Sequence, residues 1–254
     1  MKALATKPLQ LAESPLRRLR AMVRAVPYYG KGRLCPVCGR SSRRFRPYGS
    51  VPREEAQCAH CGALERHRLF WLYVSRRTNL LDGKPKRMLH VAPELCFEPI
   101  LRQRLGDNYV TADLFNPRAM VRMDITGIDY PDESFDVIYC SHVLEHVQDD
   151  RKAMREFYRV LKGNGWAILL APIIIEETFE NPSIVEPSER SRHFGRKDHV
   201  RAYGRDYTDR LRDAGFIVEV TTVNDLARND EKVQMGLTPA SGEIYYCTKE
   251  HIGE

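Results

Sequence analysis

Residues 135–147 read Phe-Asp-Val-Ile-Tyr-Cys-Ser-His-Val-Leu-Glu-His-Val, and the rest of the chain is organised around this stretch. Its first six residues form a short apolar run, mostly β-branched or aromatic, which is typical of a strand buried on both faces. Ser141 and His142 follow where that strand would end. Open α/β sheets bind their ligands at the carboxyl ends of parallel strands. The stretch therefore predicts a buried strand with a ligand site at its end.

A helix and a second strand follow this stretch. Asp149 and Asp150 precede a run with apolar residues at three-to-four spacing, which predicts a helix that Gly163 closes. Residues 166–171 are apolar again and predict the next strand. Strand, polar edge, helix and strand make one βαβ unit, which indicates an α/β fold.

The segments FDVIYCSHVLEHV and RVLKGNGW resemble the fourth and fifth strands of class I S-adenosylmethionine-dependent methyltransferases of the type 11 kind. The pattern is most similar to small-molecule O-methyltransferases, including enzymes of ubiquinone biosynthesis, and it covers roughly residues 86–247. The resemblance implies a Rossmann-like, doubly wound sheet of seven strands. It also implies that S-adenosylmethionine is the cofactor and that the protein is a methyltransferase.

The first strand, residues 87–92, departs from the family at the loop that follows it. Relatives carry an acidic residue and a glycine-rich loop, whose small residues let backbone amides approach the cofactor. Here His90 replaces the acid, and Ala92, Glu94 and Cys96 stand where glycines would. Pro93 suits the first turn of a helix. Glu94 is therefore expected to meet the cofactor ammonium group.

Two aspartates end the next two predicted strands. Asp113 follows residues 108–112, which is the position of a carboxylate that binds ribose hydroxyls. Asp124 follows residues 121–123, and the resemblance places it on the adenine amino group. The expected cofactor-binding residues are His90, Ala92, Pro93, Glu94, Asp113, Leu114, Asp124, Ile125, Ser141 and His142.

The acceptor side of the site has several candidates. His142, Glu145 and His146 would share one face of a helical turn. His142 could act as general base, or the three could hold a divalent metal as a related Glu-x-x-Glu-His does in ubiquinone-pathway enzymes, or Glu145 and His146 could bond only to nearby loops. The long polar segment 173–205 is expected to shape the acceptor pocket, or else to be an ordinary surface loop. The predicted catalytic residues are His142, His199, Arg201 and Tyr203, with Arg201 holding an anionic group.

Four cysteines near the N-terminus form the most specific local pattern in the chain. Cys35 and Cys38 make one Cys-x-x-Cys pair, and Cys58 and Cys61 make a second. Two such pairs at this separation are typical of a structural zinc site in which four thiolates close the tetrahedron. The sequence therefore predicts a zinc ribbon that depends on its metal for folding.

Charge divides the chain into two parts. Residues 1–87 carry 20 Lys and Arg against 5 Asp and Glu, a net charge of +15, whereas residues 88–254 have a net charge of −9. The basic part indicates an anionic contact: phosphates, anionic lipid or the acidic body of the protein itself. Residues 9–26 read as a basic amphipathic helix, either a tether or a peripheral membrane contact. No apolar run approaches the roughly 20 residues that span a bilayer, and cytoplasmic residence is expected.

We predict four parts: a basic arm over 1–33, the zinc ribbon over 34–64, a connecting helix over 65–85 and the methyltransferase domain over 86–254. The leading function is methyl transfer to an oxygen of a small-molecule or glycan-type acceptor. One alternative is an RNA base methyltransferase, which the arginines and Phe45 within residues 40–46 favour. The other is a degenerate methyltransferase fold used for binding. The sequence does not indicate an oligomeric state.

Overall fold

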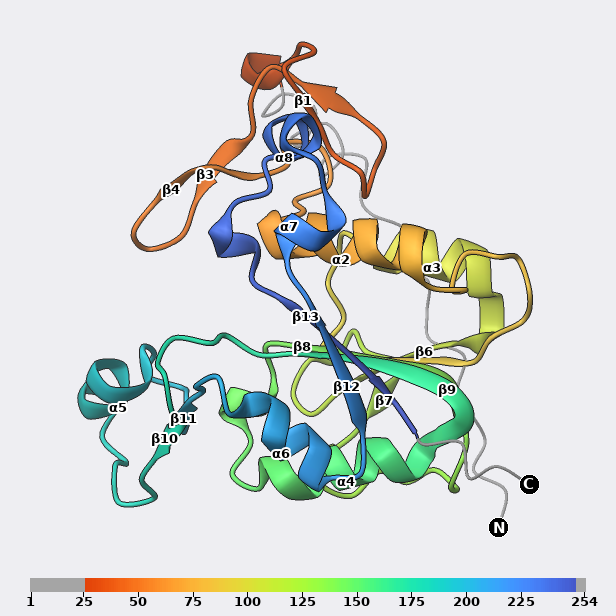
Figure 1. The fold of residues 1–254 in the computed structure, drawn as a ribbon, viewed down its shortest axis with the longest axis vertical. Helices are drawn as coiled ribbons and strands as arrows, with labels where there is room; N and C mark the ends of the chain where they lie inside the picture. The colour runs from red at the N-terminus through yellow and green to blue at the C-terminus, as the bar shows by residue number, and fades with distance from the viewer. Residues whose placement is uncertain (1–25, 250–254) are drawn as a thin grey trace.

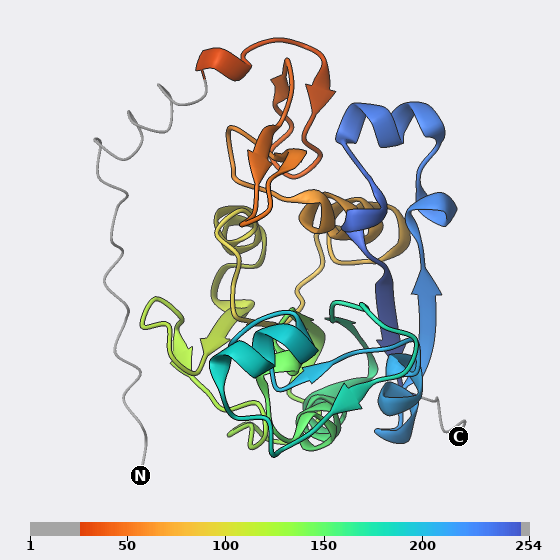
Figure 2. The same cartoon turned by 90° about the vertical axis from the view of Figure 1, so that its left-hand side faces the viewer.

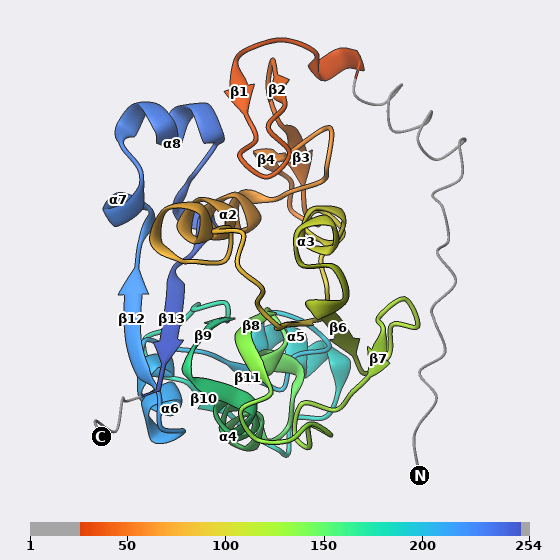
Figure 3. The ribbon, with the colours of Figure 1, turned by 90° about the vertical axis from the view of Figure 1, so that its right-hand side faces the viewer.

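The computed structural model describes residues 26–249, and its centre is a sheet of seven strands. Their bounds are β5 (Met88–Val91), β6 (Tyr109–Asp113), β7 (Val121–Arg122), β8 (Phe135–Ser141), β9 (Leu161–Leu170), β12 (Ile217–Thr221) and β13 (Ile244–Thr248). The order is β12–β13–β9–β8–β5–β6–β7, with β12 and β7 at opposite edges (Figure 3). Strands β5 to β9 run parallel, whereas β13 is antiparallel to both β9 and β12. The expected Rossmann-like, doubly wound sheet of seven strands is confirmed.

Helices cover both faces of this sheet. Helices α2 (Glu65–Arg77) and α3 (Glu98–Leu105) lie on one face, and α4 (Asp150–Val160) and α6 (Tyr207–Asp213) lie on the other (Figures 1 and 3). The apolar side of α2 is buried, and its Phe70 stacks on Tyr139 of β8 with the ring centroids 3.9 Å apart. The short helices η2 (Gly106–Asn108) and η3 (Leu144–His146) follow α3 and β8.

The N-terminal module contains two short hairpins. Its pairs are β1 (Arg33–Leu34) with β2 (Ser41–Ser42) and β3 (Arg46–Tyr48) with β4 (Arg53–Gln57), preceded by η1 (Val26–Tyr28). The helix predicted over residues 9–26 lies outside the described residues except for Val26. Among residues 26–249, no helix is both long and apolar enough to cross a bilayer. The predicted division of the chain into four parts remains a prediction.

An insertion between the last two strands lies beside the N-terminal module. It comprises α7 (Val223–Leu226), α8 (Asn229–Met235) and η4 (Pro239–Ser241) (Figures 2 and 3). Arg68 of α2, which is 0% exposed, joins the two. Its guanidinium donates to the backbone oxygens of Ala56 and Ala63 in the module and of Gly236 in the insertion, at 2.8, 3.0 and 2.9 Å. Module, connecting helix and insertion therefore pack as one unit.

Two local expectations need correction. Helix α4 begins after Asp149, whose side chain accepts from the Lys152 amide, but it ends at Val160. Leu161 already pairs with Phe135, so Gly163 lies inside β9 and does not close the helix. The segment 173–205 is not an irregular loop, because it forms β10 (Phe179–Glu180), α5 (Pro187–Phe194) and β11 (Arg201–Ala202).

Candidate active site

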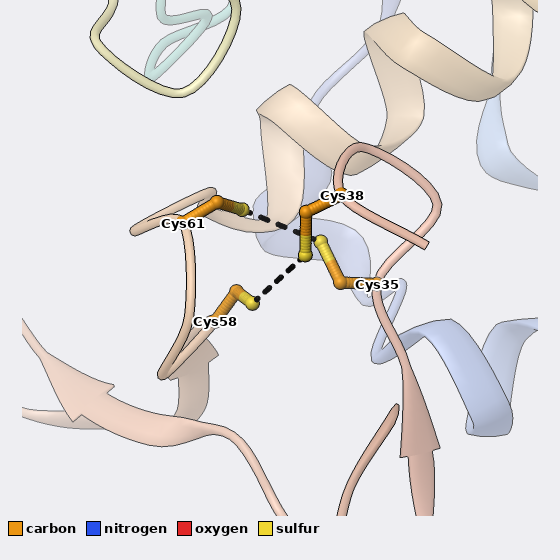
Figure 4. A group of neighbouring side chains, drawn as sticks. All are labelled: Cys35, Cys38, Cys58 and Cys61. Atoms are coloured by element: carbon orange, nitrogen blue, oxygen red, sulfur yellow. Dashed lines mark hydrogen bonds between the residues drawn. The ribbon is translucent and has the colours of Figure 1, made fainter. Parts of the chain in front are cut away.

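The four predicted zinc ligands lie together in the N-terminal module (Figure 4). The Sγ atoms of Cys35 and Cys61 are 3.7 Å apart, and those of Cys38 and Cys58 are 3.8 Å apart. A tetrahedron with Zn–S bonds of about 2.3 Å has sulfur–sulfur edges of about 3.8 Å. The cluster therefore has the dimensions of a four-thiolate zinc site, with no ligand position left for water.

Each cysteine pair is held by a tight backbone turn. The amides of Gly39 and Gly62 donate to the carbonyl oxygens of Cys35 and Cys58, at 2.9 and 3.0 Å. Both glycines have positive φ, 67° and 80°, a backbone conformation that suits glycine. The local sequence thus sets the direction of the sulfurs.

The two predicted ribose and adenine aspartates stand at adjacent strand ends. The amide of Met123 donates to the carbonyl oxygen of Asp113 (3.2 Å). The Oδ1 atom of Asp113 accepts from the amides of Phe115 and Asn116 at 2.8 Å, and Oδ1 of Asp124 accepts from the amide and hydroxyl of Thr126 at 2.9 and 2.8 Å. Within residues 26–249, neither Oδ2 atom has a protein hydrogen bond. Each carboxylate is oriented by its turn and retains an acceptor atom.

The loop after β5 has the backbone shape of a glycine loop without its glycines. Ala92 has a φ of +49°, which non-glycine residues seldom adopt. Pro93 is half-buried, and the side chains of Leu114 and Ile125 flank the two aspartates along the chain, half-buried and buried respectively. A strained backbone at a ligand edge is typical of functional loops. Ala92 therefore fits the position expected for a cofactor-binding glycine.

Glu94 and His90 are placed differently from the expectation. His90 is 0% exposed, and its Nε2 lies 2.6 Å from Glu94 Oε2. The other Glu94 oxygen accepts from the Tyr139 hydroxyl at 3.2 Å, and Tyr109 contacts His90 Nδ1 at 2.7 Å. Burial raises the pKa of Glu94, but the hydrogen bond and charge of His90 outweigh it and hold that pKa below its ordinary value. The Glu94 carboxylate thus binds inside the protein, and its predicted contact with a cofactor ammonium group is not supported.

His142 is the predicted catalytic residue that reaches a cavity. It follows Ser141, which is buried at the end of β8. Its φ is +55°, and its backbone amide donates a hydrogen bond to the Leu170 oxygen (2.9 Å). Its Nδ1 lies 3.5 Å from Oε1 of Glu145, which is 1% exposed. A histidine with a buried carboxylate behind it has the arrangement of an oriented general base.

That cavity has a volume of about 620 Å³. Residues 170–173, from the last residue of β9 onward, form its floor, and His142 forms part of its wall. The remaining lining residues come from the module, α2, the end of β11 and the insertion: Arg53, Arg66, Arg205, Thr222, Val223, Asn224, Lys232, Leu237, Thr238, Pro239, Ala240, Ser241, Gly242 and Glu243. The strand edge that carries Asp113 and Asp124 lies on the far side of β8 and β5 from the insertion (Figure 3).

His199 lies in a second cluster next to His142. One ligand-type atom from each of Glu145, His146 and His199 falls within 4.8 Å of the other two. Nδ1 of His199 contacts the Phe194 oxygen and Nδ1 of His146 contacts the Asp198 oxygen, both at 3.0 Å. Burial lowers the pKa of His199. His199 does not line the cavity, so its predicted role as a base is not supported by its position.

Arg201 and Tyr203 are not brought to the cavity either. Arg201 is 2% exposed and donates to the oxygens of Leu144, Val147 and Gln148 at 2.8, 2.5 and 2.7 Å. Tyr203 is 0% exposed, and its hydroxyl donates to Asp150 (2.6 Å). These contacts hold β11 against the start of α4. The prediction that Arg201 anchors an acceptor is therefore corrected, because its guanidinium is buried and hydrogen-bonded to other residues of the protein.

Sequence reasoning missed the residues of the insertion that line the cavity and three of its cations, Arg53, Arg66 and Lys232. These cations come from three different segments: the module, α2 and α8. One signal was present: residues 222–243 are far longer than a hairpin connection between two antiparallel strands needs. An insertion of that length at a sheet end predicts a functional surface.

Comparison with known proteins agrees with the sheet order. Residues 92–169, from the end of β5 to β9, match the family described as "Methyltransferase domain". This match covers less than a third of the chain and agrees with the Rossmann-like methyltransferase fold that the sheet order indicates. Phosphoethanolamine N-methyltransferases 3 and 1 of Arabidopsis thaliana are 35% and 36% identical to it over 97 and 96 residues. Each alignment covers 37% of this chain but only 18% of the relative, so the chain matches less than a fifth of their length.

Two further proteins are similar to this chain. The uncharacterized methyltransferase YcgJ of Bacillus subtilis (strain 168) is 46% identical over 44 residues, 17% of each chain. Its crystal structure superposes with a TM-score of 0.41 at 16% identity, covering 65% of this chain and 93% of YcgJ. A possible histamine N-methyltransferase of Thermotoga maritima gives 0.43 at 17% identity, covering 72% and 94%. At TM-scores this low, the superpositions support no statement about substrate.

Proposed function

We propose that this protein transfers a methyl group from S-adenosylmethionine to an oxygen of a small-molecule or glycan-type acceptor. The observation that carries the proposal is the position of His142. It stands at the end of the central strand, on the wall of the cavity, with the Glu145 carboxylate behind it. A base at that point is what a hydroxyl acceptor of high pKa needs.

The cofactor would bind across the ends of β5, β6 and β7. Asp113 would accept from the ribose hydroxyls and Asp124 from the adenine amino group, each through the carboxylate oxygen that its turn leaves open. Phe115, which is 84% exposed beside Asp113, offers apolar surface that a bound nucleoside would cover. When bound, S-adenosylmethionine supplies an electrophilic methyl group on a sulfonium centre.

The acceptor would bind in the cavity. Its floor, residues 170–173, and its wall from the insertion hold the acceptor and exclude water from it. His142 removes the hydroxyl proton as the oxygen becomes nucleophilic, and the buried Glu145 carboxylate lies behind the imidazole, 3.5 Å from its Nδ1. The carbonyl of Leu170 fixes the backbone of His142 from the neighbouring strand.

The four cysteines would hold a structural zinc ion. The two opposite sulfur pairs already have the edge lengths of a tetrahedral site. In this proposal the zinc has no part in the chemistry, because four thiolates leave it no open position.

A nitrogen acceptor is the second candidate, favoured by the names of the two Arabidopsis relatives. A neutral amine already has a free electron pair, so it depends less on a base than a hydroxyl does. The RNA alternative depended on Phe45 as a stacking residue, but Phe45 is only 1% exposed. The Arg68 guanidinium covers its ring, with the guanidinium carbon 4.2 Å from the ring centroid. Phe45 offers no open face for base stacking.

Calorimetry with S-adenosylmethionine and turnover with acceptor panels test the proposal. Asp113→Asn should weaken cofactor binding about tenfold or more, since a charged hydrogen-bond acceptor is lost. Asp107→Asn, at an exposed position in η2, should leave it unchanged. With a hydroxyl acceptor, His142→Gln should lower kcat about 10²-fold or more. Absence of cofactor binding would instead support the degenerate fold, and turnover of amines alone, unaffected by His142→Gln, would support the nitrogen acceptor.

A further inference from the structure

The cavity beside His142 carries an excess of positive charge. Four of its lining residues are cationic, Arg53, Arg66, Arg205 and Lys232, and among its lining residues only Glu243 is acidic. The carboxylate of Glu243 accepts from the Tyr245 hydroxyl at 2.5 Å. A concave site lined by one sign of charge attracts ligands of the opposite sign. A ligand can pair only with those cations that have no carboxylate partner within the protein.

Two of the four cations already have carboxylate partners. Arg53 donates both arms of its guanidinium to Glu65, at 3.0 and 3.1 Å, and Arg205 contacts Glu176 at 3.2 Å. Lys232 has none among residues 26–249: its Nζ donates to the amide oxygens of Asn224 and Asn229, at 2.7 and 3.3 Å. Amide oxygens orient the ammonium group without neutralising it.

Arg66 differs from the other three. It is half-buried at the start of α2, and its Nε is buried without a hydrogen-bond partner in the described chain. No hydrogen bond or ion pair joins its guanidinium to any residue between 26 and 249. The half-buried guanidinium therefore has no carboxylate partner among these residues, and an oxyanion in the cavity could pair with it. His67 Nε2 and Arg68 Nε also lack a partner, but other atoms of both side chains, and of Glu65, form hydrogen bonds, whereas no side-chain atom of Arg66 does among the described residues.

The surrounding structure keeps Arg66 and Lys232 on one cavity. Arg68, two residues along α2, donates to the Gly236 oxygen, which directly follows α8, the helix that carries Lys232. Arg76 of the same helix donates to the Leu226 oxygen (2.9 Å) and pairs with Glu231 of α8. The N-terminal module adds Arg53 and, through it, fixes Glu65. Two fixed helices therefore present the two uncompensated cations.

We propose that Arg66, together with Lys232, binds an anionic group of the acceptor, a phosphate or a carboxylate, in the cavity beside His142. This inference rests on the proposed function, because it assigns the acceptor to this cavity. The cysteine module contributes Arg53 to the cavity wall, but that arginine is already paired with Glu65. A guanidinium binds either oxyanion with two parallel hydrogen bonds, and an ammonium group adds charge.

Three probes that share one skeleton test the proposal. Phosphoethanolamine carries a phosphate, β-alanine a carboxylate, and ethanolamine no anionic group. Their binding to the full chain would be measured by calorimetry at constant ionic strength. The wild-type protein should bind at least one anionic probe about tenfold tighter than ethanolamine, and the tighter one identifies the group. Arg66→Gln should remove this preference, and Arg66→Lys should restore part of it. The control, Arg77→Gln, changes an exposed arginine of the same helix that does not line the cavity.

Each outcome decides the inference separately from the proposed function. If the wild-type protein binds neither anionic probe better than ethanolamine, or if Arg66→Gln keeps the preference, the inference is wrong. Loss of the preference in Arg77→Gln as well would also contradict it. Binding of S-adenosylmethionine, measured in parallel, should be the same in the wild type and Arg66→Gln. A protein that binds the anion through Arg66 but not S-adenosylmethionine would refute the methyltransferase proposal and leave the anion site standing.

Discussion

Arg68 and Arg201 are both buried, and each joins segments that are distant in the sequence, but their charges are compensated differently. Arg201 pairs with Glu180 at 2.9 Å and lies 3.6 Å from Asp150. Arg68 has only neutral carbonyl oxygens and the Phe45 ring as direct partners among the described residues. Burial lowers the pKa of Arg68, and the nearby charges of Cys35, Glu65 and Cys58 oppose that shift.

This difference indicates that the two halves of the molecule are stabilised independently. The half around β11 and α4 is held by a network of two arginines and two carboxylates, Arg201, Arg210, Asp150 and Glu180, that does not depend on a metal ion. The half around the module holds a buried cation close to the four cysteines, and with the proposed divalent ion bound, four thiolates would give that site a net charge of −2. Removing the metal should therefore affect the Arg68 side and spare the Arg201 side.

Metal removal is the largest expected effect. A structural zinc site contributes about 10–16 kcal/mol in small modules, so chelation should unfold the module. Hydrogen exchange should then show loss of protection in β1 to β4, whereas β8 and β9 keep theirs. Cys58→Ser should reproduce the result, and Cys247→Ser, at a buried cysteine of β13 outside the cluster, should retain a full equivalent of metal. Equal loss of protection in β8 would contradict the independence of the halves.

Arg201→Ala should have the next largest effect and the opposite distribution. Removing this side chain leaves Glu180 paired with Arg210 alone. It also leaves three carbonyl oxygens without their hydrogen-bond donor. Glu180 is 40% exposed, so most of the cost comes from the buried carbonyl oxygens, about 1–3 kcal/mol for each one left without a donor. Thermal unfolding should report that loss while the metal content stays constant. The matched change Arg192→Ala, at an exposed position in α5, should leave the unfolding midpoint nearly unchanged.

The different environments of the arginines show which features the sequence could not predict. The sheet was predictable because each buried strand is a continuous apolar run, and the cysteine cluster because each pair is set by a turn of four residues. The positions of Asp113, Asp124 and His142 followed from the same strand ends. A cation in a polar segment has no such local signature. Arg201 and Arg66 look alike in the sequence, and only the chain packed against each decides whether its partner is internal.

Long-range packing also accounts for the other differences. His90 and Glu94 replace family residues at a cofactor loop, yet they bind one another inside the protein because Tyr109 and Tyr139, from two other strands, meet them there. The cavity is built from the module, α2 and an insertion over 150 residues later in the chain. Periodicity describes one element at a time and cannot predict that convergence.

Gly236→Ala should weaken the junction between the module and the insertion by about 1–3 kcal/mol. A Cβ atom there would lie 2.9 Å from Cδ2 of Phe45 and 3.1 Å from Nη2 of Arg68, so the stacked pair must move. Gly83→Ala is the control, because Gly83 also has a positive φ but a Cβ there meets nothing within 4 Å. The difference between the two variants in denaturant unfolding isolates the contact from the backbone strain. Equal effects would show that the Phe45–Arg68 pair does not join the two parts.

The smallest expected effect concerns pH and again distinguishes the Arg68 side. Burial lowers the pKa of His67 to about 3, and its Nδ1 accepts from the Leu64 amide at 3.1 Å. The unfolded chain binds a proton on this histidine as the pH falls through about 6.5, whereas the folded protein does not until about pH 3. The free energy of unfolding should therefore decrease as the pH is lowered across that window, by about 1 kcal/mol between pH 7.5 and pH 6 from this group alone.

His67→Gln keeps an acceptor for the Leu64 amide and an N–H toward Glu94, which lies 3.7 Å from Nε2, but it removes the titration. Its stability should depend less on pH than that of the wild type, and the control His193→Gln, at an exposed histidine, should retain the wild-type slope. Parallel slopes for wild type and His67→Gln would mean that His67 is protonated in the folded state. Its charge would then add to that of Arg66 and Arg68 in the same helical turn, and Glu94 would have to compensate it in addition to bonding His90.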